Sequence, residues 1–327
     1  MAELQFREAI RAAMVEEMRR DESVFLMGEE VAEYDGAYKV SQGMLEEFGF
    51  RRVIDTPISE LGFSGIGVGA AMNGLRPIVE FMTFNIAVVG IDQIINNAAK
   101  LRYMSGGQIM IPIVFRGPNA SAGQLGATHS VAFEALYGHV PGLKVVYPSE
   151  PGDAKGLLKT AIRDDNPVIF LESEQMYGLK GEVSDEDDFT IPFGVAKVKR
   201  EGSDVTIVAH GKMYHVAQQA AKELAKDGVE AEIVDPRTIK PFDMKTVIES
   251  VKKTNRCVIV DETHPFCGIA SEVGFQLQRD AFDYLDAPVQ RVTVPDAPAP
   301  FAKNLFDLWL PGPKQVIEAV NAVTYRS

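Results

Sequence analysis

The sequence predicts an α/β protein with two domains, and three observations support this prediction. The chain has 327 residues, more than the roughly 100–200 residues of a typical domain. Apolar, β-branched segments alternate with amphipathic segments, as in βαβ units whose parallel strands are buried on both faces. An acidic, glycine-containing stretch at 178–194 separates one such series from a second.

The first series begins with a predicted helix over residues 5–20, whose apolar residues recur at helical spacing. Two further helices are predicted over 90–106, which ends at a glycine, and over 152–165. Short apolar runs around these helices predict buried strands. These runs are SVFLMG, RPIVEFMTF, IPIVFRG, LKVVYP and PVIFLE.

The second series repeats the alternation after the acidic stretch. DVTIVAHG and RCVIVDE predict strands, and AEIVDPRTIKP predicts a strand followed by a turn. Helices are predicted over 213–228 and 242–254 and, last, over 316–323. We expect a first domain at 1–180, a linker at 181–202 and a second α/β domain at 203–327. The linker is expected because acids typical of a solvated connection lie close together there. They are Glu182, Asp185, Glu186, Asp187 and Asp188.

The formal net charge of −13 limits the classes of partner. Nucleic acids and anionic membrane surfaces attract clustered Lys and Arg, so neither is expected to bind this chain. An acidic chain is suited to a basic protein partner.

The N-terminus and the cysteines indicate a reducing compartment. The first 20 residues are amphipathic but carry acids at Glu3, Glu8, Glu16 and Glu17, unlike a signal or transit peptide. We therefore expect a cytoplasmic protein, or a mitochondrial matrix protein that has already been processed. The two cysteines, Cys257 and Cys267, do not form a CxxC motif and are expected to be small buried thiols.

Glu60 is the first candidate for a chemical function. It precedes a glycine-rich apolar segment, and the nearby Ile58, Leu61 and Phe63 predict that its carboxylate is partly buried. A shielded carboxyl group is suited to sharing a proton with a ligand. A carboxylate at this point could equally cap the helix by accepting backbone N–H bonds, and the pattern alone does not decide between these functions.

An acid pair and a histidine are further candidates, and they lie in segments where ligands commonly bind. Glu29 and Glu30 follow a predicted strand, and ligands of open α/β sheets gather at the carboxyl ends of strands. His129 lies in a loop of small residues, where a histidine is suited to acid–base chemistry or to anion binding. A solvated acid pair and an exposed histidine are the alternatives to these functions.

The glycines of GIGVGAA raise a different hypothesis, that the chain binds a dinucleotide. Gly65, Gly67 and Ala70 spell G-x-G-x-x-A. However, the preceding TPISELGF is not a clean strand, and no acid lies at the spacing expected for ribose binding. Tight helix packing is the better interpretation of these glycines.

Longer motifs resemble the beta subunits of thiamine-diphosphate-dependent 2-oxoacid dehydrogenases. The segment VIDTPISELGFSGIGVGAAMNGLRPIVEFMTFN carries the resemblance, together with IPIVFRGPNASAG, THS and VPGLKVVYPSEPGDAKGLLKTAIRDDNPVIFLE. It extends from GEEVAEYDGAYKVSQG to LDAPVQRVTVPDAPAPFA and so covers nearly the whole chain. It implies a transketolase-like fold, in which a pyrimidine-binding domain is followed by a transketolase C-terminal-like domain.

The resemblance implies functions for five residues. Glu60 matches the family's glutamate in TPxxE, which bonds the N1' atom of the cofactor's aminopyrimidine ring. Glu29 matches the first acid of GEE, in an acidic tunnel between two active sites. Phe81 and Ile86 match the wall of the pyrimidine pocket, although many relatives have an aromatic residue at the position of Ile86. His129 matches a loop histidine expected to assist acyl transfer to a lipoyl group.

The resemblance also implies metal ions and partners. A structural potassium site is expected mainly from backbone oxygens, at positions Ile113, Ala161, Ile162, Asp164 and Asn166. The diphosphate and its Mg²⁺ are expected on an alpha subunit within an α2β2 tetramer, and the GDG motif that binds them does not occur in this chain. The other expected partner is the core of dihydrolipoyl acetyltransferase.

The expected reaction is oxidative decarboxylation of a 2-oxoacid with transfer of the acyl group to lipoyl. FMTFN and RGPNASAG favour the pyruvate-specific members of the family, with acetyl as the transferred group. Branched-chain 2-oxoacid and acetoin dehydrogenases are the alternatives within this chemistry. A scaffold that binds the alpha subunit without contributing to catalysis is the alternative from another class.

Overall fold

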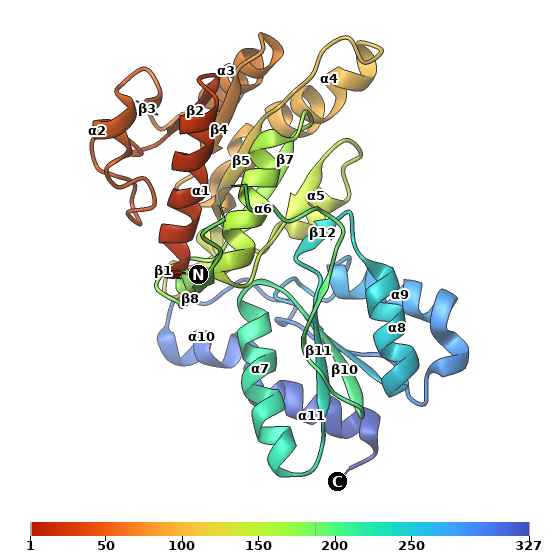
Figure 1. Ribbon diagram of the computed structural model, residues 1–327. Coiled ribbons are helices and arrows are strands. Elements are labelled where there is room, and N and C mark those ends of the chain that lie inside the picture. The colour runs from red at the N-terminus through yellow and green to blue at the C-terminus, as the bar shows by residue number, and fades with distance from the viewer. Residues whose placement is uncertain (1, 187, 327) are drawn as a thin grey trace.

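The computed structural model describes residues 2–186 and 188–326 (Figure 1). Asp187 of the predicted acidic linker therefore lies outside the described residues. Seven strands form the first sheet in the order β12-β6-β7-β5-β4-β2-β3, parallel except for β12. Their bounds are β2 (Val24–Gly28), β3 (Val53–Asp55), β4 (Arg76–Glu80), β5 (Val114–Pro118), β6 (Lys144–Val146), β7 (Val168–Glu172) and β12 (Thr238–Lys240).

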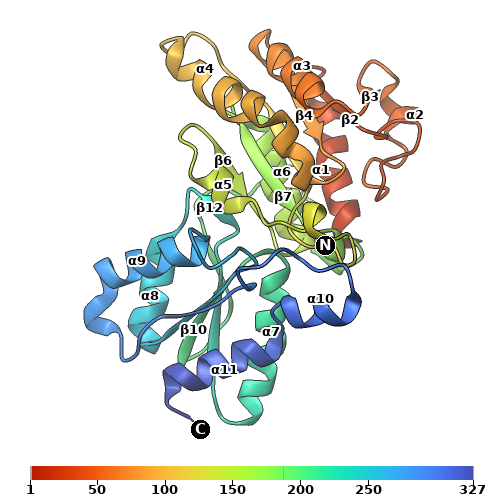
Figure 2. The same cartoon turned by 180° about the vertical axis from the view of Figure 1, so that it is seen from behind.

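Helices cover both faces of this sheet. α1 (Phe6–Arg20) and α6 (Pro151–Arg163) lie side by side on one face, whereas α3 (Glu60–Met72) and α4 (Ala99–Met104) lie on the other (Figures 1 and 2). The predicted helix at 90–106 is less regular than expected. Within this range a π segment, η2 (Gln93–Ala98), is followed by α4, and a 3₁₀ segment, η1 (Phe84–Gly90), leads into it.

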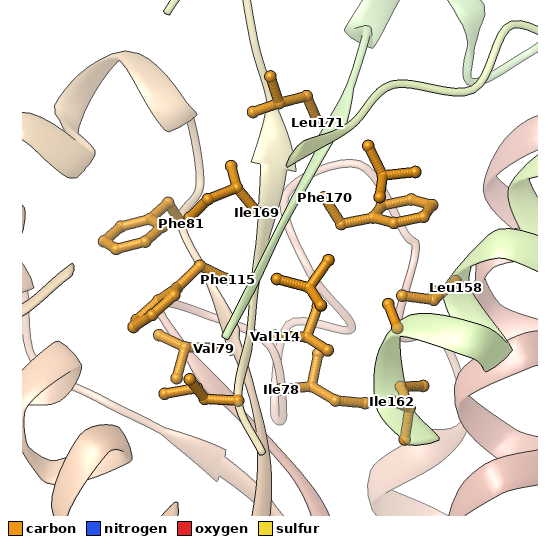
Figure 3. Packing of buried hydrophobic residues seen from close by; sticks show 14 of the residues in the cluster. Ile78, Val79, Phe81, Val114, Phe115, Leu158, Ile162, Ile169, Phe170 and Leu171 are labelled. Atoms are coloured by element: carbon orange, nitrogen blue, oxygen red, sulfur yellow. The ribbon is translucent and has the colours of Figure 1, made fainter. Parts of the chain in front are cut away.

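Apolar side chains alternate between the two faces of the central strands, which explains why these strands are apolar throughout. Figure 3 shows Phe81, Val79 and Phe115 on one side, and Ile78 and Phe170 on the side that Leu158 and Ile162 of α6 cover. Short elements complete this part of the chain. They are α2 (Met44–Phe48), η3 (Ala127–His129), α5 (Glu134–Gly138) and η4 (Glu174–Met176).

The second sheet has the order β14-β13-β10-β11-β9, parallel except for β9. Its strands are β9 (Lys197–Arg200), β10 (Val205–Ala209), β11 (Ala231–Asp235), β13 (Cys257–Val260) and β14 (Gln290–Val292). One core packs α7 (Gly211–Lys226) and α11 (Pro313–Thr324) against it, and another packs α8 (Met244–Thr254) and α9 (Ile269–Ala281). η5 (Phe282–Tyr284) and α10 (Lys303–Trp309) lie in the connections.

Two strand pairings join segments that lie far apart in the sequence. β1 (Ala2–Gln5) pairs with β8 (Lys180–Val183), so the amino end of the chain returns to the start of the predicted linker. β12 leaves the second half of the chain and joins the first sheet beside β6. The predicted division at 1–180, 181–202 and 203–327 stays a prediction, with β8 and β9 near the two ends of the proposed linker.

The expectation of two buried thiols is half right. Cys257 is fully buried in β13, and burial raises its pKa to about 12. Cys267 is exposed, because it lies in the connection between β13 and α9 and not in a strand. Over the described ranges 2–186 and 188–326, no helix has both the length and the apolar character needed to cross a bilayer.

Candidate functional site

A cavity of about 270 Å³ lies at the carboxyl ends of β2 and β4. Glu29 directly follows β2 and Phe81 directly follows β4, and these two strands are parallel neighbours. This sheet edge is where open α/β sheets hold ligands. The cavity brings together the five residues that the resemblance implied near the cofactor. Its lining is Glu29, Ile58, Glu60, Phe81, Met82, Thr83, Ile86 and His129.

Glu60 is the first residue of α3 and is only 7% exposed. Its predicted burial has a different cause from the one expected, because Ile58 and Leu61 are exposed while only Phe63 packs inward. Gly90 allows η1 to lie against the start of α3. A Cβ atom at Gly90 would lie 2.8 Å from the Glu60 carbonyl oxygen and 2.9 Å from Ser64 Oγ.

The Glu60 carboxylate does not act as a helix cap in this geometry. Among residues 2–186 and 188–326, no hydrogen-bond donor meets either of its oxygens. A carboxylate that closes a helix end accepts backbone N–H groups. Here it faces the cavity instead, where its oxygens remain available to a ligand.

Glu29 lies across the same cavity and is 8% exposed. Its Oε1 atom is buried and has no hydrogen-bond partner among the described residues. Burial, helped by the negative charges of Glu60 and Glu80, raises the pKa of Glu29 to about 7. A buried polar atom without a partner is uncommon, and this one adjoins a cavity large enough for a ring-shaped group.

An ion cluster that the sequence did not lead us to expect lies beneath Glu29. Arg116 of β5 is fully buried and bonds Glu172 of β7 through both carboxylate oxygens, at 2.6 and 2.5 Å, and it also bonds Glu80 of β4. The Tyr177 hydroxyl donates to Glu172 at 2.7 Å. The sequence carried a signal of this cluster. Glu80, Arg116 and Glu172 are charged residues in three otherwise apolar runs, and these runs form neighbouring strands.

The apolar wall of the cavity is aromatic. Phe81 is 1% exposed and contacts three phenyl rings, those of Phe63, Phe84 and Phe115, with centroids 5.4, 5.3 and 6.2 Å away. Ile86 of η1 is partly buried beside it. A flat apolar surface facing two carboxylates is suited to a planar ring with polar nitrogens.

His129 ends η3 in the loop between β5 and α5, and its side chain is partly exposed. Its Nδ1 lies 2.8 Å from Thr128 Oγ1. The loop returns to the cavity because Asn85 accepts the N–H of Val131 at 2.6 Å. The histidine is therefore at the open side of the cavity and the two carboxylates are further inside.

The five residues of the expected potassium site lie around the carboxyl end of α6 and the segments leading into β5 and β7. Arg76 donates to the carbonyl oxygens of Ile162 and Asp164 at 3.1 and 3.2 Å. Asn166 donates its backbone N–H to Asp164 Oδ1 at 2.9 Å. Carbonyl oxygens carry two lone pairs, so those that accept from Arg76 keep one lone pair for a cation, but Lys144 and Arg102 also bond Asp164 and Asn166 and add positive charge to this corner.

The same fold carries one buried cluster with metal-ligand chemistry that the sequence did not lead us to expect. Ligand atoms of Glu134, His210 and Asp261 lie within 4.8 Å of one another. Both Asp261 oxygens, however, already accept hydrogen bonds from Thr263, and one also accepts the N–H of Ala270. This cluster is therefore explained as a hydrogen-bonded contact between the two halves of the chain.

The glycines of GIGVGAA lie inside α3 and not at a strand-to-helix turn. A Cβ atom at Gly67 would lie 2.7 Å from Val79 Cγ2 and 3.2 Å from Ile113 Cδ1. Gly67 thus allows the helix to pack closely on β4, and the glycines, which all lie within the helix, do not form a phosphate cradle. The structure gives the dinucleotide hypothesis no support.

Family models match both halves of the chain. The model for "Transketolase, pyrimidine binding domain" matches residues 2–180, and that for "Transketolase, C-terminal domain" matches residues 194–316. A Rhizobium meliloti protein named pyruvate dehydrogenase E1 component subunit beta is 57% identical over 100% of this chain and 71% of its own length. The Rickettsia felis protein of that name is 58% identical over 98% of both chains.

More distant comparisons give the same result. A mitochondrial pyruvate dehydrogenase E1 component subunit beta-2 of Oryza sativa is 52% identical over 99% of this chain and 87% of its own length. A solved structure, "Split gene transketolase, inactive beta4 tetramer", superposes with a TM-score of 0.78 at 24% identity and covers 99% of both chains. At that identity the likeness concerns the fold.

Proposed function

This chain belongs to the family of pyruvate dehydrogenase E1 component beta subunits, and we propose that it performs the oxidative decarboxylation of pyruvate together with an alpha subunit. The observation that carries the proposal is the cavity of Glu29, Glu60, Phe81, Ile86 and His129. Its two carboxylates and its aromatic wall fit the aminopyrimidine ring of thiamine diphosphate. When bound, this cofactor supplies the nucleophilic carbon for decarboxylation.

Within the site, Glu60 would hold a proton against the ring nitrogen of the cofactor. A shielded carboxyl group suits this function because little water competes for the proton. Phe81 and Ile86 would hold the ring by apolar contact. Glu29 has a raised pKa that allows it to be protonated near neutral pH, so it can exchange a proton without leaving a fixed buried charge.

His129 would act later, at the open side of the cavity. A partly exposed histidine on a loop can reach a group that enters from solvent. We propose that it assists acetyl transfer to the lipoyl group of dihydrolipoyl acetyltransferase. The diphosphate and its Mg²⁺ would be held by the alpha subunit in an α2β2 tetramer, and we propose the bacterial cytoplasm or the mitochondrial matrix as the compartment.

The potassium site is proposed at Ile113, Ala161, Ile162, Asp164 and Asn166. Its support is the resemblance, together with the carbonyl oxygens of Ile162 and Asp164, which lie close together at the end of α6. A cation there would stabilise the carboxyl end of α6, where backbone carbonyls lack helical partners. Thermal unfolding in potassium and sodium chloride at equal ionic strength tests this, with a higher midpoint expected in potassium and equal midpoints contradicting the site.

Co-expression with the alpha subunit tests the function as a whole. The purified complex should decarboxylate pyruvate in the presence of thiamine diphosphate and Mg²⁺, and should prefer pyruvate to branched-chain 2-oxoacids and acetoin. A preference for either alternative substrate would assign the chain to that enzyme instead. A purified complex without any thiamine-dependent activity would contradict the proposal.

A further inference from the structure

The loop that carries His129 is closed at its base by hydrogen bonds. The Ala120 N–H donates to the Val131 carbonyl at 3.2 Å, and the Asn85 side chain bonds both of these residues, at 3.3 and 2.6 Å. The base is buried, whereas the middle of the loop is largely exposed. The position of His129 therefore depends on what holds this base.

Two charged residues from the second half of the chain grip the loop at Ser121. Glu262 Oε1 accepts the Ser121 N–H at 2.9 Å and the Ser121 hydroxyl at 2.5 Å. Lys212 Nζ lies 2.6 Å from both the carbonyl and the hydroxyl oxygen of Ser121, and 2.7 Å from Glu262 Oε1. We name these three residues the loop clamp. All three are at least nine-tenths buried.

The positions of the two charges are not explained by the stability of their own elements. Lys212 is the second residue of α7, where the helix dipole disfavours a positive charge. Glu262 follows β13 at the carboxyl edge of the second sheet, and its Oε2 atom lacks a hydrogen-bond partner among the described residues. Burying an ion pair gains little stability over apolar side chains of similar size, so stability alone does not account for this pair.

The backbone next to the clamp is strained. Ala120 has φ 64°, a left-handed conformation that costs an alanine roughly 1 kcal/mol or more. Such a conformation persists only where surrounding contacts hold it. Ser121 directly follows Ala120, and the loop clamp supplies such contacts by bonding both the N–H and the carbonyl oxygen of Ser121.

We propose that Glu262 and Lys212 are positioning residues, through which the C-terminal half of the chain sets the placement of the His129 loop over the cavity. They act through Ser121 and do not touch the cavity themselves. The inference rests on the function proposed for His129. It adds that acetyl transfer depends on the packing of the two halves of the chain and not only on residues near the cofactor.

The test compares variants within the complete heterotetramer. The double variant Lys212→Met and Glu262→Leu removes the clamp without leaving one charge buried alone. Glu262→Gln is the milder variant, because its amide oxygen can still accept the Ser121 N–H. Glu232→Gln is the matched control, since Glu232 is a buried carboxylate that bonds Lys253 at the amino end of β11.

Hydrogen exchange of residues 122–131 is the first measurement, and it requires no activity. The double variant should exchange there about tenfold faster or more, with Glu262→Gln intermediate and the control unchanged. In the same complexes, the rate of acetyl transfer to a free lipoyl domain should fall about tenfold. Decarboxylation with an artificial electron acceptor should change by about threefold or less.

Unchanged exchange of the loop in the double variant would overturn the inference, as would equal losses in the two half-reactions. If the double variant does not fold, the same comparison is made with Glu262→Gln, and unchanged exchange there is equally contradictory. If the wild-type complex has no activity on pyruvate, the proposed function fails, but the exchange experiment still decides whether the clamp holds the loop.

Discussion

Glu29 and Glu60 face each other across one small cavity, and the negative charge of Glu60 is among the causes that raise the pKa of Glu29. They come from different elements, since Glu29 follows β2 and Glu60 begins α3. Two carboxylates that share a shielded space do not both ionise easily. Glu29 can therefore carry a proton near neutral pH, which suits the proposed use of the cavity.

The raised pKa of Glu29 predicts a dependence of stability on pH. The folded chain keeps a proton on Glu29 up to about pH 7, whereas the unfolded chain releases it near 4.5. The folded chain thus binds more protons in this window, so the free energy of unfolding falls as pH rises through it, by at most about 3 kcal/mol. Urea unfolding should show Glu29→Gln to be more stable than wild type at pH 8 and equally stable at pH 4. A constant difference at both values would refute the assignment.

Arg116 should contribute strongly to the stability of the fold. Replacing it with Met leaves Glu80 and Glu172 buried without their shared partner. Removing one member of a buried ion pair costs about 3–5 kcal/mol, so the free energy of unfolding should fall by that amount. Arg19→Met is the control, since it breaks an exposed pair with Glu47. A similar small loss in both variants would show that the buried cluster is not needed for stability.

Two glycines of α3 should respond in opposite ways to alanine. Gly67→Ala places a methyl group 2.7 Å from Val79 Cγ2, so the helix must shift and stability should fall. Gly69 has nothing within 4 Å of the added atom, so Gly69→Ala should stabilise the isolated chain by about 0.5–1 kcal/mol. Thermal unfolding of the two variants distinguishes them, and a shift in the same direction would contradict the packing described for α3.

His129→Ala should separate the two half-reactions of the complex. The side chain is partly exposed, whereas Glu60 and Phe81 are buried, so decarboxylation should be nearly unchanged. Acetyl transfer to a free lipoyl domain should fall about 10²-fold, the lower range for a positioned acid–base group. His139→Ala is the control, since His139 directly follows α5 and does not line the cavity. Equal effects of His129→Ala on both half-reactions would remove the specific role of this histidine.

The alternation of apolar and amphipathic segments was enough to predict the α/β class and most strands and long helices. The predicted helix at 5–20 is observed as Phe6–Arg20, because its apolar residues face α6. The helix α9 and the strands β1, β3, β8, β9, β12 and β14 were not predicted. The pairings of β1, β8 and β12 depend on contacts between distant segments, which local periodicity does not record.

The candidate site was predicted in part by pattern and in larger part by resemblance. Pattern identified Glu60, Glu29 and His129, but it could not bring them into one cavity. Burial of Glu60 was expected from Ile58 and Leu61, which are exposed. The close approach at Gly90, which brings η1 against the first turn of α3, joins residues 30 positions apart in the sequence and became visible only in the structure.

The central claim is that Glu60 shares a proton with the bound cofactor, and Glu60→Gln in the reconstituted heterotetramer tests it most directly. Glutamine keeps the size of the side chain but cannot exchange this proton. We predict an intact complex that decarboxylates pyruvate at least about 10²-fold more slowly than wild type. Calorimetry should show that this complex still binds thiamine diphosphate. A variant that decarboxylates pyruvate near the wild-type rate would contradict the function proposed for Glu60.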